Sequence, residues 1–357
     1  MPRVEVKGEG NRAIFQVFKA YYSLRPELFL PEDFAMREFA FQPWGSPGYT
    51  RHISFRTIEE VYEYLQSKVP LHAYYSLARY ELPEAPSMEE KGFLGADLMF
   101  DIDADHLEGC STAIVGDECI RRAGRLIHRL ARILKRDFSI RDYIIYFTGH
   151  RGFHLIARCE GCEGLGREER LEIAHYVAAE GLDLSLIFPS RPGEEAAVPS
   201  TDDPGWRGWI AEWLAFRGIL NLGRGLREIL GAEWRRRLQE AVAGQAVPID
   251  MQVTQDTSRL VRIGGTLHGK TGLKVTVVED PLRFKPTPAL SPVRGEALVE
   301  AVEDVEVDSL LGSPISLRRG RRYRLEAPIG ILLALKGMAK LLEVNGVVKV
   351  DTSRGSL

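Results

Sequence analysis

The feature that most constrains this chain is residues 96–103 (ADLMFDID), an apolar run that ends in carboxylates. A short, mostly apolar run of this kind is typical of a strand buried on both faces in the middle of a sheet. Because side chains alternate along a strand, Asp101 and Asp103 project from the same face. We therefore predict a buried central strand whose C-terminal end opens on a polar site.

The rest of the chain alternates between strand-like and helix-like segments. Strand-like composition recurs at residues 37–41, 49–55, 73–80, 143–147, 153–158, 247–253, 260–263 and 273–278. Helical spacing is found at 12–24, 58–67 and 117–136, and a final helix is expected over 327–344. Residues 165–245 are helical and rich in Arg, Glu and Trp, while strand-like segments flank them on both sides. The pattern predicts an α/β fold with mixed central β-sheets flanked by helices, as one domain over 1–357 with a helical insertion at 165–245.

The aspartate pair itself indicates a cation site. Two carboxylates on one strand face repel each other unless a cation lies between them. Mg²⁺ and Mn²⁺ take carboxylate ligands and leave positions open for substrate phosphates. The alternative is that these aspartates only cap the following loop. It fits Asp105 better than Asp101 or Asp103, because a charge on a buried strand is costly unless it has a partner.

Residues 148–154 (TGHRGFH) lie where one predicted strand turns into the next. The two glycines permit a tight turn and the close approach of a ligand. Arg151 offers a planar fork suited to phosphate oxygens, and Thr148 and His154 add further donors. A hairpin with incidental polar residues remains the alternative interpretation.

A third group combines Asp250 with basic residues that follow it closely. These are Arg259 and Arg262 of RLVR, and His268 and Lys270 of GGTLHGKT (264–271). The ending resembles a phosphate-binding P-loop, but a strand-like segment follows it where a P-loop requires a helix. We therefore interpret the segment as a basic loop that contacts phosphates beside Asp250.

Composition limits the function classes. The formal net charge of the 357 residues is −3, which excludes a polybasic coat but not a local basic channel. No signal peptide and no apolar stretch of about 18 residues is present, so we expect no membrane association and a cytoplasmic location. The four cysteines are Cys110, Cys119, Cys159 and Cys162. In a cytosolic chain they are reduced or metal-bound more often than disulfide-linked, except in hyperthermophiles.

Taken together and in order, FDID (100–103), TGHRGFH (148–154) and the D…RLVR…LHGKTG series (250–272) resemble the three signature motifs of the catalytic small subunit of archaeal and eukaryotic DNA primases. REFAF (37–41) and DDPGW (202–206) are similar to stretches of archaeal members. The resemblance spans about residues 20–280 and implies the archaeo-eukaryotic primase fold.

The resemblance assigns roles to individual residues. It implies that Asp101, Asp103 and Asp250 hold Mg²⁺ or Mn²⁺. Asp256 competes for the third place, but the offsets from Asp250 to Arg262 and His268 match the family pattern. It implies nucleotide-phosphate contacts at Thr148, Arg151, His154, Arg262 and His268, with Arg259 and Lys270 as additions.

The resemblance also implies an activity and partners. The chain would synthesise short primers on a single-stranded DNA template by two-metal-ion nucleotidyl transfer from NTPs or dNTPs, as a heterodimer with a primase large subunit. Its location would be nucleoid-associated within the cytoplasm. Two alternatives remain: a primase-like polymerase of repair or of a mobile element, and a non-catalytic nucleic-acid-binding descendant.

One departure from the family concerns zinc. Members usually carry a zinc knuckle of four Cys or His ligands after the first motif, whereas only Cys110, Cys119 and His106 stand there. Strand 153–158 is expected to run away from the site, which places Cys159 about 20 Å from the turn. Zinc, a disulfide and free thiols therefore all remain open for these cysteines.

Overall fold

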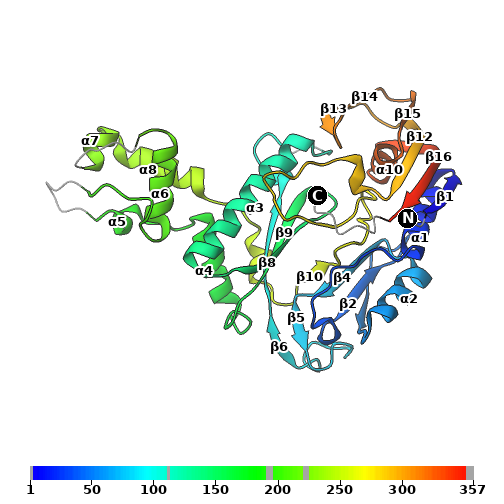
Figure 1. Cartoon of the computed structure of the whole chain (residues 1–357), viewed down its shortest axis with the longest axis horizontal. Coiled ribbons are helices and arrows are strands. Elements are labelled where there is room, and N and C mark those ends of the chain that lie inside the picture. The colour runs from blue at the N-terminus through cyan, green and yellow to red at the C-terminus, as the bar shows by residue number, and fades with distance from the viewer. Residues whose placement is uncertain (1–2, 111–112, 190–195, 220–224, 351–357) are drawn as a thin grey trace.

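The structure, a computed structural model, describes residues 3–110, 113–189, 196–219 and 225–350. It contains three four-stranded sheets, two smaller hairpin sheets and flanking helices (Figure 1). The predicted mixed α/β class with a helical insertion is therefore confirmed. Among the described residues, no helix is both long and apolar enough to span a membrane.

The central sheet has the strand order β11–β8–β9–β7. Its strands are β7 (Leu98–Asp103), β8 (Asp142–Phe147), β9 (Gly152–Arg158) and the two-residue β11 (Thr276–Val277). Strand β9 pairs antiparallel with both β7 and β8, so β7 and β8 run in the same direction on either side of it. Helix α3 (Asp117–Asp137) connects β7 with β8 and packs its apolar side against the sheet. The predicted buried strand at 98–103 is confirmed.

A second sheet of order β10–β4–β2–β3 lies beside the first. It consists of β2 (Phe39–Gln42), β3 (Thr50–Ile53), β4 (His72–Ser76) and β10 (Leu260–Arg262). Its core includes stacked and edge-on aromatic rings, among them Phe39, Phe41 and Phe55. Helices α1 (Gly10–Ser23) and α2 (Ile58–Lys68) lie next to it, and the hairpin β5 (Ala78–Tyr80) and β6 (Phe93–Ala96) leads into β7.

The third sheet joins the two ends of the described chain. Its order is β1–β16–β12–β15, formed by β1 (Arg3–Gly8), β16 (Ala339–Lys349), β12 (Val293–Ala301) and β15 (Arg322–Glu326). Helix α10 (Ala327–Leu335) packs on it, and the hairpin β13 (Val305–Leu310) and β14 (Ser313–Leu317) extends from it. The helix predicted over 327–344 is confirmed for 327–335, but its end was wrong, because the chain turns at Gly337, with φ of 77°, and continues as β16.

The helical insertion projects from the body at the left of Figure 1. It comprises α4 (Arg167–Ala178), α5 (Leu184–Ile187), α6 (Gly205–Phe216), α7 (Leu226–Leu230) and α8 (Trp234–Gln245). Helix α4 contributes Val177 to the main core, whereas Leu214, Leu230 and Leu238 belong to a separate small core. That the whole chain forms one domain stays a prediction.

The segment after the insertion differs from the sequence prediction. Residues 247–253 do not form a strand; instead α9 (Met251–Gln255) begins there. Asp250 is the N-cap of α9, and its Oδ1 accepts hydrogen bonds from the N–H groups of Gln252 and Val253. A capping aspartate ends the preceding extended chain, because its side chain takes the first free N–H groups of a helix. Three 3-10 turns complete the fold at Phe34–Met36, Ala104–His106 and Pro288–Leu290.

Candidate active site

Two aspartates and a histidine share one face of the central sheet. Residues Phe100 and Ile102 of β7 are buried, whereas Asp101 and Asp103, alternating with them, point to the opposite face. Asp101 lies directly opposite His154 of β9 in the antiparallel register, with Oδ1 3.6 Å from Nε2 of the imidazole. Burial first, and then the charges of Arg262 and Arg259, lower the pKa of His154 to about 3, so the ring is neutral.

Asp101 is in an environment that favours a cation. Its Oδ1 is buried and has no hydrogen-bond partner. Burial, followed by the charges of Asp103 and Asp250, raises the pKa of Asp101 to about 8. Each of these three carboxylates makes ionisation of the others less favourable. A divalent cation bound between them would neutralise this repulsion. In the described part of the chain, no three acidic, histidine or cysteine side chains already converge as a complete cage. Because like charges repel, we expect the trio to close only around an ion.

Asp250 and Asp256 are the two candidates for the third carboxylate. The backbone N–H of Asp250 donates to the carbonyl oxygen of Asp101, and its charge is among those that raise the Asp101 pKa. Asp256 lines the cavity, but its Oδ1 accepts hydrogen bonds from the N–H and the hydroxyl of Ser258. We favour Asp250 because it lies against the strand that carries the aspartate pair, although its Oδ1 also caps α9.

The TGHRGFH turn places Arg151 beside the acidic face. Arg151 forms ion pairs from Nε to Asp103 (2.9 Å) and from its guanidinium to Asp105 (2.6 Å). Gly152 begins β9 so close to β7 that a Cβ there would lie 2.3 Å from the carbonyl oxygen of Ile102. Gly149 has φ of 76° and faces His268, so it allows this turn to pack against the third motif.

The third motif contributes residues to the site from β10 and from the turn that follows it. Arg262 is partly buried, its guanidinium lies 4.8 Å from the ring centroid of Tyr74, and its NH1 contacts His72 Nδ1 at 2.8 Å. The segment 267–274 is a turn closed by a bridge between Leu267 and Lys274, and no helix follows it, which confirms that it is not a P-loop. The Thr271 hydroxyl donates to the carbonyl oxygen of Gly149 and so joins the second and third motifs.

Three histidines, His72, His150 and His268, pack against one another next to the turns of the second and third motifs. The His150 and His268 rings stack with centroids 4.7 Å apart, and the His72 ring meets His268 edge-on at 4.8 Å. Burial is the largest cause of the lowered pKa of each of the three imidazoles, so all three rings are neutral. The backbone N–H of Lys270 donates to His268 Nδ1, which leaves the proton of that ring on Nε2. His268 can therefore donate a hydrogen bond to an anion.

These elements enclose one cavity of about 510 Å³. Of the residues predicted to bind the catalytic metal or the nucleotide, all except Asp250 line it, namely Asp101, Asp103, Thr148, Arg151, His154, Arg259, Arg262, His268 and Lys270. Sequence reasoning did not identify Tyr49, Arg51 and Tyr74, which also line it, or His72 behind Arg262. The only available signal was their position in or next to strands of the second sheet. The cavity size suits a drug- or nucleotide-sized ligand.

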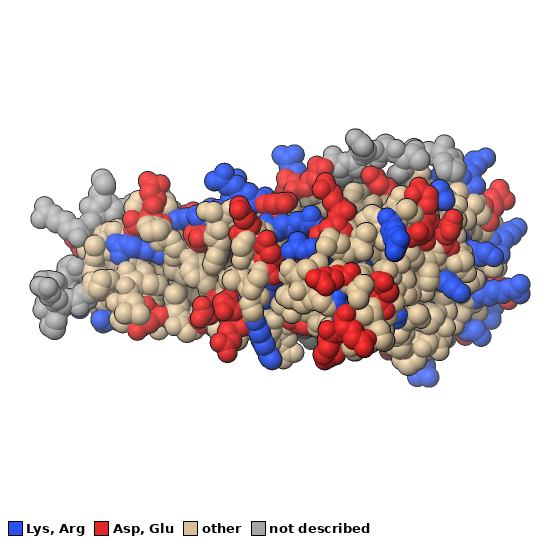
Figure 2. Space-filling view, turned by 90° about the horizontal axis from the view of Figure 1, so that it is seen from below, with Lys and Arg blue, Asp and Glu red and all other residues tan. Residues whose placement is uncertain are grey.

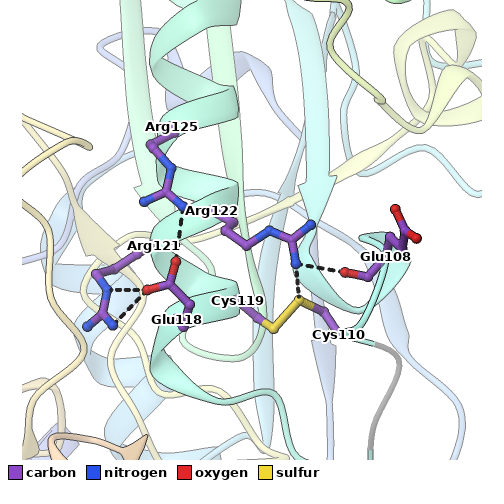
Figure 3. The surroundings of a disulfide bond; sticks show 7 residues. All are labelled: Glu108, Cys110, Glu118, Cys119, Arg121, Arg122 and Arg125. Carbon is purple, nitrogen blue, oxygen red and sulfur yellow. Dashed lines mark hydrogen bonds and ion pairs between the residues drawn. A yellow bond between two sulfur atoms is a disulfide. The ribbon is translucent and has the colours of Figure 1, made fainter. Parts of the chain in front are cut away.

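The cysteines form disulfides in this structure. Cys110 is bonded to Cys119 (Figure 3), and Cys159 is bonded to Cys162. Cys110 and Cys119 therefore offer no thiolates, and His106 lies on a 3-10 turn without a partner set of metal ligands. Of the three alternatives for these cysteines, the structure has the disulfide, and the residues present do not fit a zinc knuckle. The bond ties the loop after Asp103 to the first turn of α3, where Arg122 contacts Cys110 Sγ and the Glu108 carbonyl oxygen.

The surface agrees with the near-neutral composition. On the face shown in Figure 2, acidic and basic side chains are interspersed and form no continuous basic surface. The cationic groups of the site instead line the cavity, among them Arg151, Arg259, Arg262 and Lys270. The prediction that basic character would be local is consistent with this arrangement.

The three motifs that line this cavity lie within a segment that matches a known protein family. The family model described as DNA primase small subunit matches residues 100–280. The chain is 47% identical over 352 residues to the DNA primase small subunit PriS of Aeropyrum pernix, covering 98% of both chains. It is 37% identical over 361 residues to PriS of Saccharolobus solfataricus, covering 93% of this chain and 96% of that one.

A solved structure shows a more distant likeness. The polymerase domain of Mycobacterium tuberculosis ligase D, in complex with DNA, has a TM-score of 0.40 and 11% identity, covering 77% of this chain and 84% of that chain. The family assignment rests on the sequence matches, which extend through the acidic strand, the TGHRGFH turn and the third motif. The chain belongs to the DNA primase small subunit family.

Proposed function

We propose that the chain is the catalytic subunit of a DNA primase, which synthesises short primers on single-stranded DNA by nucleotidyl transfer from NTPs or dNTPs. The observation that carries this proposal is the cavity in which an acidic strand end faces cationic and imidazole donors. Asp101 and Asp103 lie on one side, and Arg262, His268 and Lys270 lie on another. Carboxylates for a cation beside donors for phosphates are what joining nucleotides requires.

Asp101, Asp103 and Asp250 would hold Mg²⁺ or Mn²⁺. Such ions, when bound, lower the pKa of an attacking 3′-hydroxyl and neutralise the pyrophosphate leaving group. The chain's own donors would bind the triphosphate: the guanidinium of Arg262, the Nε2–H of His268 and the ammonium of Lys270. Arg151, now paired with Asp103 and Asp105, would exchange part of that pairing for phosphate oxygens. Neutral His154 would donate to a phosphate oxygen beside Asp101.

The aromatic side of the cavity would contact the rest of the nucleotide. Tyr74 supports Arg262 with its ring, and Tyr49 meets Tyr74 edge-on with centroids 5.6 Å apart. Tyr49 is 48% exposed, so its ring is available for stacking with a base or sugar. The partners that follow from this role are a single-stranded DNA template and a primase large subunit, and the site of action is the nucleoid.

Primer synthesis on an unprimed template tests the proposal. The chain, alone and with the large subunit, is incubated with circular single-stranded DNA, Mg²⁺ or Mn²⁺, and labelled NTPs or dNTPs. We expect short labelled products without any added primer. Efficient extension of a supplied primer without initiation would instead identify a primase-like polymerase of repair or of a mobile element. Template binding without any incorporation under either metal would identify a non-catalytic descendant.

A further inference from the structure

Lys336 reaches the site from a part of the chain that lies outside the matched segment 100–280. It is the C-cap of α10, whose apolar residues Ile331 and Leu335 lie against Gly272 of the third motif. The N–H of Gly337 donates to Ala334 O and that of Met338 donates to Leu333 O, at 3.0 Å each. This pair of bonds is the Schellman arrangement that fixes a helix end. The position of Lys336 is therefore set by a rigid helix terminus and not by a loose loop.

The Lys336 ammonium is directed at the second motif. Its Nζ lies 2.5 Å from Nε2 of His150, and 3.4 Å from the carbonyl oxygen of Ala113. Because an ammonium can only donate, Nε2 of His150 accepts, and the neutral ring carries its proton on Nδ1. The same ring stacks on His268, whose own tautomer is set by the N–H of Lys270. Lys336 thus orients one of the two stacked imidazoles that border the cavity.

The charges around Lys336 are mostly of the same sign. Burial lowers the pKa of Lys336, Arg151 and Lys270 lower it further, and Asp105 opposes them. Lys336 also contributes to the lowered pKa of His150, after burial. A half-buried ammonium near other cations and neutral imidazoles is unfavourable for the fold unless an anion binds among them. The position of Lys336 is therefore better explained by the binding of an anionic ligand than by a contribution to the stability of the fold.

We propose that Lys336 is a positioning residue for the nucleotide triphosphate, which fixes the His150 tautomer and places a positive charge behind the His150–His268 pair. The inference rests on the proposed function, because it takes the anion in the cavity to be the triphosphate. Lys336 does not line the cavity, so it acts through His150 and through its charge. Binding of the nucleotide is therefore expected to depend on Lys336 more than the chemical step does.

The test compares K336M, K336R and the wild type, with K340M as the matched control on the exposed position of β16. KM and kcat for nucleotide incorporation are measured on a primed template, and inorganic tripolyphosphate is used as a probe that needs no catalysis. We expect K336M to raise KM on the order of tenfold while kcat changes less than about threefold, as for loss of one partly screened charge. The rise in melting temperature that tripolyphosphate causes should shrink in K336M. K336R should recover much of both effects, and K340M should match the wild type.

Stability separates a positioning role from a structural one. K336M should melt no lower than the wild type without ligand, since it removes a half-buried cation from near Arg151 and Lys270. A lower melting temperature with unchanged KM and an unchanged tripolyphosphate shift would overturn the inference. A wild type that binds tripolyphosphate through Lys336 but incorporates no nucleotide would refute the proposed function and leave this inference standing.

Discussion

The backbone N–H of Asp250 donates a hydrogen bond of 3.1 Å to the carbonyl oxygen of Asp101. This bond joins the start of α9 to the strand β7, and so brings the third carboxylate of the proposed metal site against the first two. The Asp250 side chain at the same time caps α9 through Oδ1. One residue thus serves the fold with one oxygen and retains a second oxygen and its charge for a cation.

D250N separates these two roles. An asparagine oxygen still caps the helix, so we expect the melting temperature to change by no more than a few degrees. Loss of the charge should lower nucleotide incorporation by about 10²-fold or more, since the metal ligand set is incomplete. D256N is the matched control, because Asp256 Oδ1 accepts hydrogen bonds from the N–H and the hydroxyl of Ser258, and this variant should retain activity within about threefold. The reverse ranking of the two variants in an incorporation assay would assign the third ligand to Asp256.

Arg151 is expected to be important for activity but not for stability. Its side chain is 36% exposed, and exposed ion pairs such as those to Asp103 and Asp105 contribute about 0–1 kcal/mol to folding. R151A should therefore unfold almost as the wild type does, while kcat/KM falls by about 10²-fold through loss of a phosphate donor. R121A removes a comparable ion pair, to Glu118 on α3, and Arg121 is not among the residues that line the cavity. Similar kcat/KM values for the two variants would show that Arg151 does not contact the nucleotide.

The Cys110–Cys119 disulfide should stabilise the chain. A cross-link between residues 9 positions apart is expected to contribute about 2–3 kcal/mol, so C110S/C119S should melt a few degrees lower. Denaturant unfolding with and without a reductant measures this effect. The effect of the same reductant on C110S/C119S measures how much the remaining Cys159–Cys162 bond contributes to stability. Wild-type protein that carries one tightly bound zinc per chain, and four reactive thiols after its removal, would contradict the disulfide.

Glu38 holds a buried charge network next to the cavity. Its side chain is fully buried, accepts from Arg51 at 2.9 Å and lies 3.6 Å from Lys91 Nζ, which is also fully buried. Burial favours the neutral acid, but the bonds from Arg51 and His52 outweigh it and hold the pKa of Glu38 below its ordinary value. E38Q leaves Lys91 buried without its counter-charge, so it should cost about 3–5 kcal/mol of unfolding free energy at pH 7.

The pH dependence of that loss follows from the direction of the shift. Because the folded pKa of Glu38 is depressed, its stabilisation is complete above the unfolded value of about 4.3 and is lost as the pH falls through the folded pKa. The difference between wild type and E38Q should therefore narrow below about pH 4. E63Q, on an exposed position of α2, provides the control. A difference in unfolding free energy that is constant from pH 7 to pH 3 would contradict the network.

Much of the central sheet could be predicted from the sequence, because its periodicity reports burial directly. The LMFDID run, apolar up to its two aspartates, became β7, and the YIIYF run became most of β8. The site followed from the same logic, since strand ends and tight turns gather Asp101, Asp103, Arg151 and His154 locally. Arg262 and His268 could be added because they lie in recognisable basic motifs.

The parts that could not be predicted depend on contacts between distant segments. Nothing local marks β1 as the partner of β16, which pairs residue 3 with residue 349. Residues 247–253 have strand-like composition, yet Asp250 caps a helix there because its side chain finds two free N–H groups. Lys336 is an ordinary helix-end lysine until α10 packs against Gly272 and brings its ammonium to His150.

The most direct test of the whole account is nucleotide incorporation by D101A/D103A in the presence of Mg²⁺ or Mn²⁺. Both side chains are on one face of β7 and only partly buried, so the variant should fold, which a thermal melt confirms. We expect incorporation to fall by several orders of magnitude under both metals while the protein still binds single-stranded DNA. Incorporation that survives the double substitution at near wild-type rates would contradict the claim that this strand end holds the catalytic metal ions.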